Sequence, residues 1–350
     1  MKVIYVGPLW EGGTCRMRYE ALQALGNVVV PVDTEPCGPT PLLLKEKLFF
    51  RAGFPVDKFE VNKRLLGSFQ ANTGVDLLWV DKGIVIAKET LIAIKRLNPG
   101  TLSLHYNPDD PFGGYGKSGW RRFITTIPVY DVHFVPRMVN VPEYKKCGAK
   151  RVEFLVPTRG FSMELHRPIV PSAMDIRKYG ADVGFIGSYE RSRAMSLLSL
   201  ARAGFNVRVW SRNWNASFLH DNIRLVKTPL YGEEYVRALN CFKIALCFLR
   251  KNNRDEHSSR SIEIPACGTF MLAERTAEHI RLFKEGVEAE YFGDDSELIA
   301  KCGFYLSNDH IRSQIAKAGR NRCEVSGYDY RNRVAAILRS AFPSRSFNLS

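Results

Sequence analysis

The chain has 350 residues, of which 45% are hydrophobic and 25% charged, so it is a folded protein with room for two domains and not a disordered one. Lys and Arg exceed Asp and Glu by 50 to 36, and the net charge of +14 favours anionic partners such as nucleotide diphosphates or anionic lipid surfaces. This excess is spread evenly, with 22 basic and 16 acidic residues up to Leu165 and 28 and 20 after it, so no nucleic-acid partner is expected.

The first part of the chain alternates short apolar runs with segments of helical period, which is typical of a parallel sheet with crossover helices. No apolar run reaches the roughly 20 residues of a membrane span, and the first is too short for a signal peptide, so a cytoplasmic protein is expected. Predicted strands lie at residues 2–6, 28–32, 75–80, 101–105, 131–135 and 152–156. Predicted helices lie at residues 15–25, 57–70, 88–97 and 140–147.

Residues 158–179 have no sustained period and are predicted to be a linker. The alternation then restarts, with predicted strands at residues 181–186, 207–210, 244–248, 269–272 and 287–292 and helices at 191–203, 231–239 and 259–266. We therefore predict an α/β protein with two Rossmann-like, doubly wound domains, at residues 1–157 and 180–327, facing a ligand-binding cleft. A closing helix at residues 328–342 is expected to follow, and packing back on the first domain is one arrangement for it.

A glycine-rich turn follows the first predicted strand. Gly12 and Gly13 precede the helix that carries Arg16, and backbone N–H groups at such a turn can approach an anion. The turn has neither the GxGxxG nor the GxxxxGK[ST] pattern, and a tight turn needs glycine for structural reasons alone. A phosphate or acceptor loop and a structural turn both stay open.

A polar segment follows the strand that ends at His105. Asp109 and Asp110 offer hydrogen-bond acceptors to sugar hydroxyls, and neighbouring aromatic residues offer stacking faces. The alternative is a helix cap and a satisfied strand-end histidine. The two carboxylates are adjacent and the eight cysteines include no CxxC pair, so neither a metal site nor a cofactor is expected.

The second half carries two further candidate loops. Gly187 and Ser188 form the turn before a helix with Arg191 and Arg193, a place where a diphosphate can bind, although Ser188 as a simple helix cap is an equal alternative. The stronger candidate is the loop after residues 244–248. Its predicted donor-binding residues are Arg250, Lys251, Ser258, Arg260 and Glu263, with the basic groups on phosphates and Glu263 on ribose hydroxyls.

From Gly184 onward the sequence resembles GT-B glycosyltransferases related to family 4, most of all the CgeB-like, spore-maturation branch. The segments that carry the resemblance are FIGS at residues 185–188, RSIEIPACG at 260–268 and DDSEL at 294–298, with NPDDPF at 107–112 in the first half. Members usually have two acids eight residues apart, the second holding the donor ribose. Glu263 matches the second acid, whereas Asp255 stands where the first is usually Glu.

The resemblance implies a GT-B fold with an acceptor-side N-terminal domain and a C-terminal donor domain. It also implies metal-independent transfer of a hexosyl or related group, with retention, from a nucleotide-diphosphate sugar to a glycan, protein, lipid or small-molecule acceptor. Candidate catalytic residues are His105, Asp109, Asp110 and Asp255. The alternatives are a sugar-nucleotide epimerase, a non-catalytic sugar- or nucleotide-binding relative, and a protein that binds nucleic acid or the surface of an anionic membrane.

Overall fold

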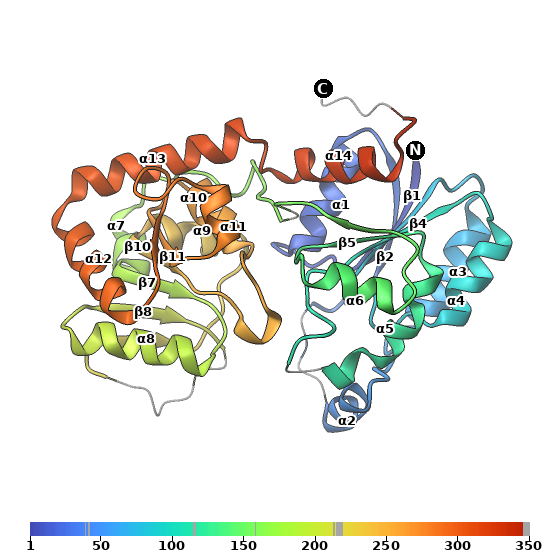
Figure 1. Ribbon diagram of the computed structural model, residues 1–350, viewed down its shortest axis with the longest axis horizontal. Helices are drawn as coiled ribbons and strands as arrows, with labels where there is room; N and C mark the ends of the chain where they lie inside the picture. The colour runs from blue at the N-terminus through green and yellow to red at the C-terminus, as the bar shows by residue number, and fades with distance from the viewer. Residues whose placement is uncertain are drawn as a thin grey trace. The chain divides into compact units, whose positions relative to one another are not determined.

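The computed structural model describes residues 1–38, 40, 43–114, 117–157, 159–212, 214 and 220–345. The chain divides into two compact units, each built on its own parallel sheet with helices packed against it (Figure 1). The first unit comprises Met1–Thr158, Lys251–Arg254 and Tyr330–Ser350, and the second comprises Arg159–Arg250 and Asp255–Asp329.

The first sheet has six parallel strands in the order β2-β1-β3-β4-β5-β6. They are β1 (Lys2–Gly7), β2 (Val28–Asp33), β3 (Leu77–Asp81), β4 (Leu102–Tyr106), β5 (Val132–Val135) and β6 (Val152–Phe154). Helices cover both faces of the sheet, so the central strands are buried on both sides and appear in the sequence as continuous apolar runs.

The helices of the first unit are α1 (Thr14–Ala24), α2 (Leu44–Ala52), α3 (Val61–Ala71), α4 (Lys88–Leu97), α5 (Arg121–Thr126), α6 (Asn140–Lys146) and α14 (Tyr330–Ala341). Apolar side chains of α3 and α4, including Leu65, Leu91 and Ile94, pack with Ile4 and Val6 of β1 in one core. The C-terminal helix α14 packs against α1, and its inward side chains are buried.

The second sheet also has six parallel strands, in the order β12-β11-β10-β7-β8-β9. They are β7 (Ala181–Ile186), β8 (Val207–Trp210), β9 (Ile223–Val226), β10 (Phe242–Cys247), β11 (Met271–Glu274) and β12 (Glu290–Phe292). Counted from β7, this is the strand order of the Rossmann fold, in which the chain reverses direction across the sheet between the first and fourth strands. The reversal lies between β7 and β10.

The helices of the second unit are α7 (Ala173–Tyr179), α8 (Arg191–Arg202), α9 (Gly232–Asn240), α10 (Arg260–Ala266), α11 (Ala277–Leu282), α12 (Asp295–Ser307) and α13 (Asp309–Val325). The core unites Val183 and Phe185 of β7 with Leu197 of α8 and Leu298 of α12. A glycine is required where β7 passes β10, because a Cβ on Gly184 would lie 2.3 Å from the Phe242 ring.

The prediction of an α/β protein with two doubly wound parallel sheets is confirmed. The edge strand β9 was not predicted, and neither were the helices α2, α5, α11, α12 and α13. The stretch expected to be aperiodic contains α7, whose start is fixed by a reciprocal capping box between Ser172 and Asp175. None of the helices in the described ranges is long and apolar enough to cross a membrane.

Candidate functional site

The carboxyl ends of β7 and β10 mark the place where a doubly wound sheet binds ligands, because the connections leave these two strands toward opposite faces. The predicted donor-binding residues of the second unit follow these ends. The Gly187–Ser188 turn leaves β7 and leads into α8, and the segment after β10 leads through Arg250 to α10. The sheet topology therefore brings the two candidate loops of the second half to one edge.

The turn after β7 is held by the neighbouring strand β8 and by an aromatic ring. Trp214 donates its indole N–H to the Gly187 carbonyl at 2.9 Å, and the Gly187 N–H donates to the Trp210 carbonyl at 3.1 Å. A Cβ on Gly187 would lie 2.6 Å from the Phe185 ring, so no larger residue fits without displacing that ring. Helix α8 begins after Glu190, not Ser188, and no side chain caps it. Arg191, in its first turn, is exposed.

Arg193 and Arg260 are two cations that meet at one aromatic ring. Each guanidinium carbon lies 5.9 Å from the centroid of Phe185. Arg193 is 1% exposed and donates to the Ser188 carbonyl at 3.0 Å, while its nearest carboxylate is that of Glu190, at 3.8 Å. Among the described residues, the buried Nε atoms of both arginines have no hydrogen-bond acceptor.

The pKa of Arg193 is affected by the positive charges close to it. Burial, and next the charge of Arg260, lower the pKa of Arg193 to about 10, and Arg250 acts in the same direction. An arginine whose pKa falls this far still carries its charge near neutral pH, but its charged form is poorly compensated. An anion bound at this edge would supply the missing compensation.

Helix α10 presents Arg260 and Glu263, and a buried hydrogen-bond chain fixes its start. The Ser258 N–H donates to Ser261 Oγ at 2.8 Å, and Ser261 Oγ lies 2.7 Å from His279 Nε2. His279 Nδ1 lies 2.6 Å from the Glu274 carbonyl and must donate to it, so Nε2 accepts the Ser261 hydroxyl proton. Burial lowers the pKa of His279, which keeps the ring in this neutral tautomer. Ser258 was predicted to bind the donor, but in the structure it helps to fix the start of α10.

Glu263 is buried on α10, at 7% exposed, and is oriented by a tyrosine. The Tyr235 hydroxyl donates to Glu263 Oε2 at 2.9 Å. Burial, and next the charge of Glu263, raise the pKa of Tyr235 well above its usual value, so the hydroxyl stays a donor. His166 lies nearby, with its ring edge-on to Tyr235 and its Nδ1 accepting the Ser162 N–H at 3.0 Å.

Asp255 and Lys251 lie in different surroundings from the arginine pair. The Asp255 side chain is 3% exposed and forms an ion pair with Arg159 at 3.4 Å. Lys251 groups with the first unit and is exposed. In that same segment Arg254 forms a bidentate pair with Asp110, at 2.5 and 2.9 Å, and binds Glu143 at 2.8 Å. The backbone at Arg254 is left-handed, with a φ of 46°.

The three candidate catalytic residues of the first unit are not gathered around one open site. Asp110 is buried and anchors Arg254. Burial would raise the pKa of Asp110, but hydrogen bonds from Arg254 and Asn140 lower it below its usual range. Asp109 instead pairs with Lys82 at 2.8 Å and raises the pKa of that lysine. Of the two aspartates, Asp109 is the one that stays partly exposed.

His105 is a core residue of the first sheet. It is fully buried, its ring stacks on Phe123 at 4.6 Å, and its Nδ1 lies 3.1 Å from the Nδ1 of His133. Burial, and next the neighbouring His133, lower the pKa of His105 well below its usual value. The position at the end of a strand is correct, but the side chain points into the core, where it cannot reach a substrate.

The glycine-rich turn of the first unit begins α1. Gly12 has a φ of 75°, and Gly13 is the N-cap residue of α1. A Cβ on Gly13 would lie 3.0 Å from the Trp10 carbonyl oxygen, so packing alone is a reason for glycine at this position. Arg16 is exposed and pairs with Glu20 at 2.6 Å, one turn further along the helix.

Two residues beside the second-unit site were missed. Tyr235 lies in a predicted helix, but nothing in the sequence marks its hydroxyl as a partner of Glu263. Glu274, whose carboxylate accepts the Leu249 N–H at 2.8 Å, had a usable signal, because it ends β11 at the same sheet edge as Gly187.

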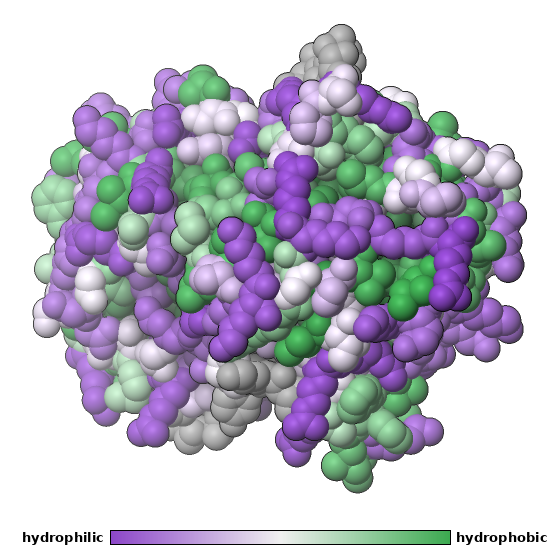
Figure 2. Space-filling view, turned by 45° about the vertical axis from the view of Figure 1, so that its right-hand side comes forward, coloured by the Kyte–Doolittle hydropathy of each residue, from purple (hydrophilic) through white to green (hydrophobic). Residues whose placement is uncertain are grey.

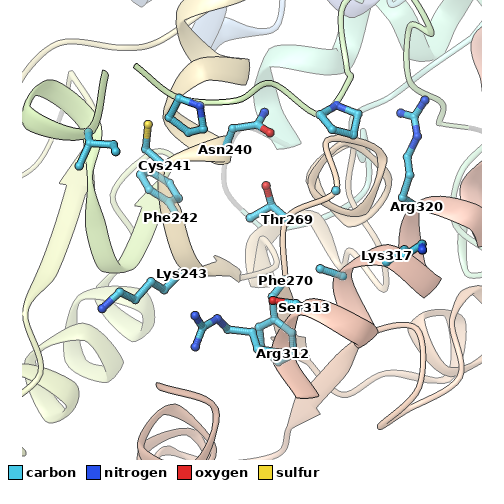
Figure 3. A pocket seen from close by; sticks show the side chains of 15 residues that line it. Asn240, Cys241, Phe242, Lys243, Thr269, Phe270, Arg312, Ser313, Lys317 and Arg320 are labelled. Atoms are coloured by element: carbon cyan, nitrogen blue, oxygen red, sulfur yellow. The ribbon is translucent and has the colours of Figure 1, made fainter. Parts of the chain in front are cut away.

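A separate cavity of about 590 Å³ opens in the second unit, with Lys243, Arg312 and Lys317 among its lining residues (Figure 3). It also contains Phe242 and Thr269, at the amino-terminal ends of β10 and β11. Ligands of doubly wound sheets bind at the opposite edge, so we do not assign this cavity to the donor. Over the described ranges no group of three His, Cys, Asp or Glu side chains could hold a metal ion.

Residues 191–339 match the protein family described as glycosyl transferase-like. Among curated protein sequences none matches the chain.

Several solved structures have the same fold, and each aligns with this chain over almost the full length of both proteins. Sucrose-phosphate synthase from Thermosynechococcus elongatus has a TM-score of 0.67 at 15% identity, covering 98% of this chain and 100% of its own. Anabaena HepE in complex with UDP and glucose has a TM-score of 0.65 at 11% identity, covering 97% and 99%. A glycosyltransferase from Rickettsia africae has a TM-score of 0.63 at 11% identity, covering 99% of both chains. The fold is GT-B.

Proposed function

We propose that this chain, which has the GT-B fold, is a glycosyltransferase that transfers a sugar from a nucleotide-diphosphate donor held at the carboxyl edge of the second sheet. The observation that carries this proposal is the pair Arg193 and Arg260 at the reversal between β7 and β10, two cations with buried Nε atoms that lack acceptors in the described chain. HepE, which has the same fold, was solved with UDP and glucose bound.

The diphosphate is assigned to the arginine pair. Charge-assisted hydrogen bonds from guanidinium groups are strong and match phosphate oxygens in geometry. The uncapped N-terminus of α8, a helix of 12 residues, adds backbone N–H groups and the positive end of its dipole. Together they would stabilise the diphosphate as it gains negative charge on leaving the sugar.

The donor ribose is assigned to Glu263. Its Oε2 accepts the Tyr235 hydroxyl at 2.9 Å, and a carboxylate has further lone pairs for the ribose hydroxyls. The Tyr235 bond would hold the carboxylate in one orientation before the donor arrives, which lowers the entropy lost on binding.

We propose transfer with retention and without a metal ion, as the resemblance to family 4 implies. In such a reaction the arginines would take the role that a divalent cation has elsewhere, and no cofactor is needed besides the donor. Asp109, with its partner Lys82, remains the candidate on the acceptor side, since it is the partly exposed carboxylate at the edge of the first sheet. His105 and Asp110 are no longer assigned to catalysis. The acceptor class stays open among glycans, proteins, lipids and small molecules.

Thermal unfolding in the presence of UDP, GDP or ADP tests the donor site. One of these nucleotides is expected to raise the melting temperature. At a hundredfold excess over its Kd, binding adds about 2.7 kcal/mol to the free energy of unfolding. Glu263→Ala should reduce this shift, whereas Glu324→Ala, a change at an exposed carboxylate of α13, should leave it intact. If no nucleotide stabilises the wild-type protein, the donor proposal fails.

The reaction itself is tested on a panel of nucleotide sugars by chromatography coupled to mass spectrometry, because chromatography separates isomers of equal mass. Release of the nucleoside diphosphate with free sugar, in the absence of an acceptor, supports a transferase. Conversion of the nucleotide sugar to an isomer of the same mass would instead indicate an epimerase. Activity that persists in EDTA supports the metal-independent mechanism, and its loss would remove that part of the proposal.

A further inference from the structure

Helix α2 of the first unit presents a large apolar surface to solvent. Six apolar residues of the helix and its flanks have exposed fractions from 43% to 77%: Leu43, Leu44, Leu48, Phe49, Phe54 and Val56. We call these six residues the α2 patch. Figure 2 shows apolar side chains gathered on the protrusion at the lower end of the view, where Figure 1 places α2. Contiguous apolar surface of this kind marks an interaction site.

The α2 patch is held outward by contacts on the other side of the helix. Glu46 is buried, and Phe50 lies so close to Gly119 that a Cβ there would be 2.7 Å from the Phe50 ring. Leu44 and Leu48 lie one turn apart on the opposite side. Gly53, with a φ of 94°, ends the helix, and its carbonyl accepts the Arg122 N–H at 2.9 Å. The exposed face is therefore fixed by the fold.

The charges around the α2 patch are mostly basic. Lys45, Lys47 and Arg51 on α2 and Lys58 beyond it are exposed. Of the nearby acids, Glu46 accepts the Leu43 N–H at 2.7 Å and Asp57 accepts the Val61 N–H at 2.7 Å, while Glu60 is exposed and pairs with Lys63 at 3.5 Å. Apolar side chains framed by lysine and arginine are the composition of helices that lie in the interface of an anionic bilayer.

We propose that the α2 patch docks on an anionic lipid surface, with its leucine and phenylalanine side chains among the headgroups and its basic residues on lipid phosphates. A second copy of the chain fits less well, because a twofold contact through this face would bring the basic residues of both copies together. The proposal does not depend on the donor site. It gives the protein a place at a membrane surface, where a lipid-linked acceptor would be presented.

Co-sedimentation with vesicles tests the docking surface. The full chain is mixed with vesicles of phosphatidylcholine alone or with about one third phosphatidylglycerol, and binding is expected only to the anionic vesicles. The double variant Leu44→Ser/Leu48→Ser should lower the bound fraction about tenfold. Val170→Ser, at another exposed apolar residue, should bind like wild type.

The contribution of the basic residues to vesicle binding is tested with a second pair of variants. Lys45→Gln/Lys47→Gln should weaken binding to anionic vesicles and reduce its dependence on salt. Lys145→Gln/Lys146→Gln, which removes two exposed lysines from α6 of the same unit, should have little effect. Melting temperatures and nucleotide shifts like those of wild type would show that the variants are folded.

Three results would overturn the proposal. They are equal binding of the wild type to both kinds of vesicle, unchanged binding of the leucine variant, and a dimeric wild type in light scattering that the leucine variant converts to a monomer. The last result would assign the α2 patch to self-association.

Discussion

The carboxyl edges of the two sheets differ in how their charges are compensated. At the edge of the first sheet two cations have a close carboxylate, in the pairs Arg18 with Asp81 and Lys82 with Asp109. At the edge of the second sheet Arg193 and Arg260 share an aromatic ring, and the nearest carboxylate to Arg193 is 3.8 Å away. Ion pairs at the first edge stabilise their own unit, whereas the arginine pair at the second edge is suited to bind an anion.

The largest effect is expected from breaking a compensated pair. Arg18 and Asp81 have side chains 2% and 0% exposed, with 3.0 Å between Arg18 Nε and Asp81 Oδ2. Arg18→Met leaves Asp81 charged and buried, so the free energy of unfolding should fall by about 3–5 kcal/mol. Urea unfolding measures it. Arg16→Met, which breaks the exposed pair with Glu20, should cost less than about 1 kcal/mol. Equal losses in the two variants would contradict the comparison.

The second prediction concerns the uncompensated edge. Arg260→Gln removes a cation that stabilises the leaving diphosphate, so kcat for donor hydrolysis should fall about 10²–10³-fold. Because the same change relieves repulsion with Arg193, the melting temperature without ligand should not fall. Initial rates and calorimetry give the two values. Arg224→Gln, at an exposed arginine of β9, is the matched control and should keep its activity.

The third prediction uses the histidine pair under the first edge. Burial lowers the pKa of His133 to about 4, from about 6.5 in an unfolded chain. Between these values the unfolded chain binds more protons, so stability is full above pH 6.5 and falls as the pH drops toward 4. His133 alone is expected to contribute a slope of about 1.4 kcal/mol per pH unit. Urea titrations across this range should be flatter for His133→Phe and unchanged for His310→Asn, which alters an exposed histidine.

The smallest effect is expected at Tyr235. Tyr235→Phe frees Glu263 from one hydrogen bond worth about 1 kcal/mol, so KM for the donor should rise about fivefold with kcat nearly unchanged. Tyr179→Phe removes a comparable bond, from the Tyr179 hydroxyl to Glu234 at 2.7 Å, outside the site. Steady-state kinetics should leave that control at the wild-type KM. A larger change in kcat than in KM would mean that Tyr235 acts in the chemical step.

The alternation of buried strands and periodic helices was enough to predict the two sheets, because strands covered on both faces appear as unbroken apolar runs. Helix α2 was not predicted, because helices were expected to bury their apolar face in a core and the apolar face of α2 points to solvent. Strand β9 was missed because it is a short edge strand that is only partly buried.

The candidate site was predicted unevenly for a similar reason. Sequence position indicates which residues follow a strand, and this brought Gly187, Arg193, Arg260 and Glu263 to one sheet edge. Side-chain direction depends on the packing around each residue, so His105 was expected at a site although it faces the core. Partners far apart in the chain, such as Tyr235 and Glu263, cannot be found without the fold.

The C-terminal helix has a consequence for synthesis. Helix α14 packs on α1, yet Tyr330 leaves the ribosome about 170 residues after Thr158. At a translation rate of 5–20 residues per second, α14 would follow the rest of the first unit by roughly ten to thirty seconds. During that interval the nascent first unit would expose the surface that Val334 and Leu338 later bury, so a chaperone could bind it until α14 emerges.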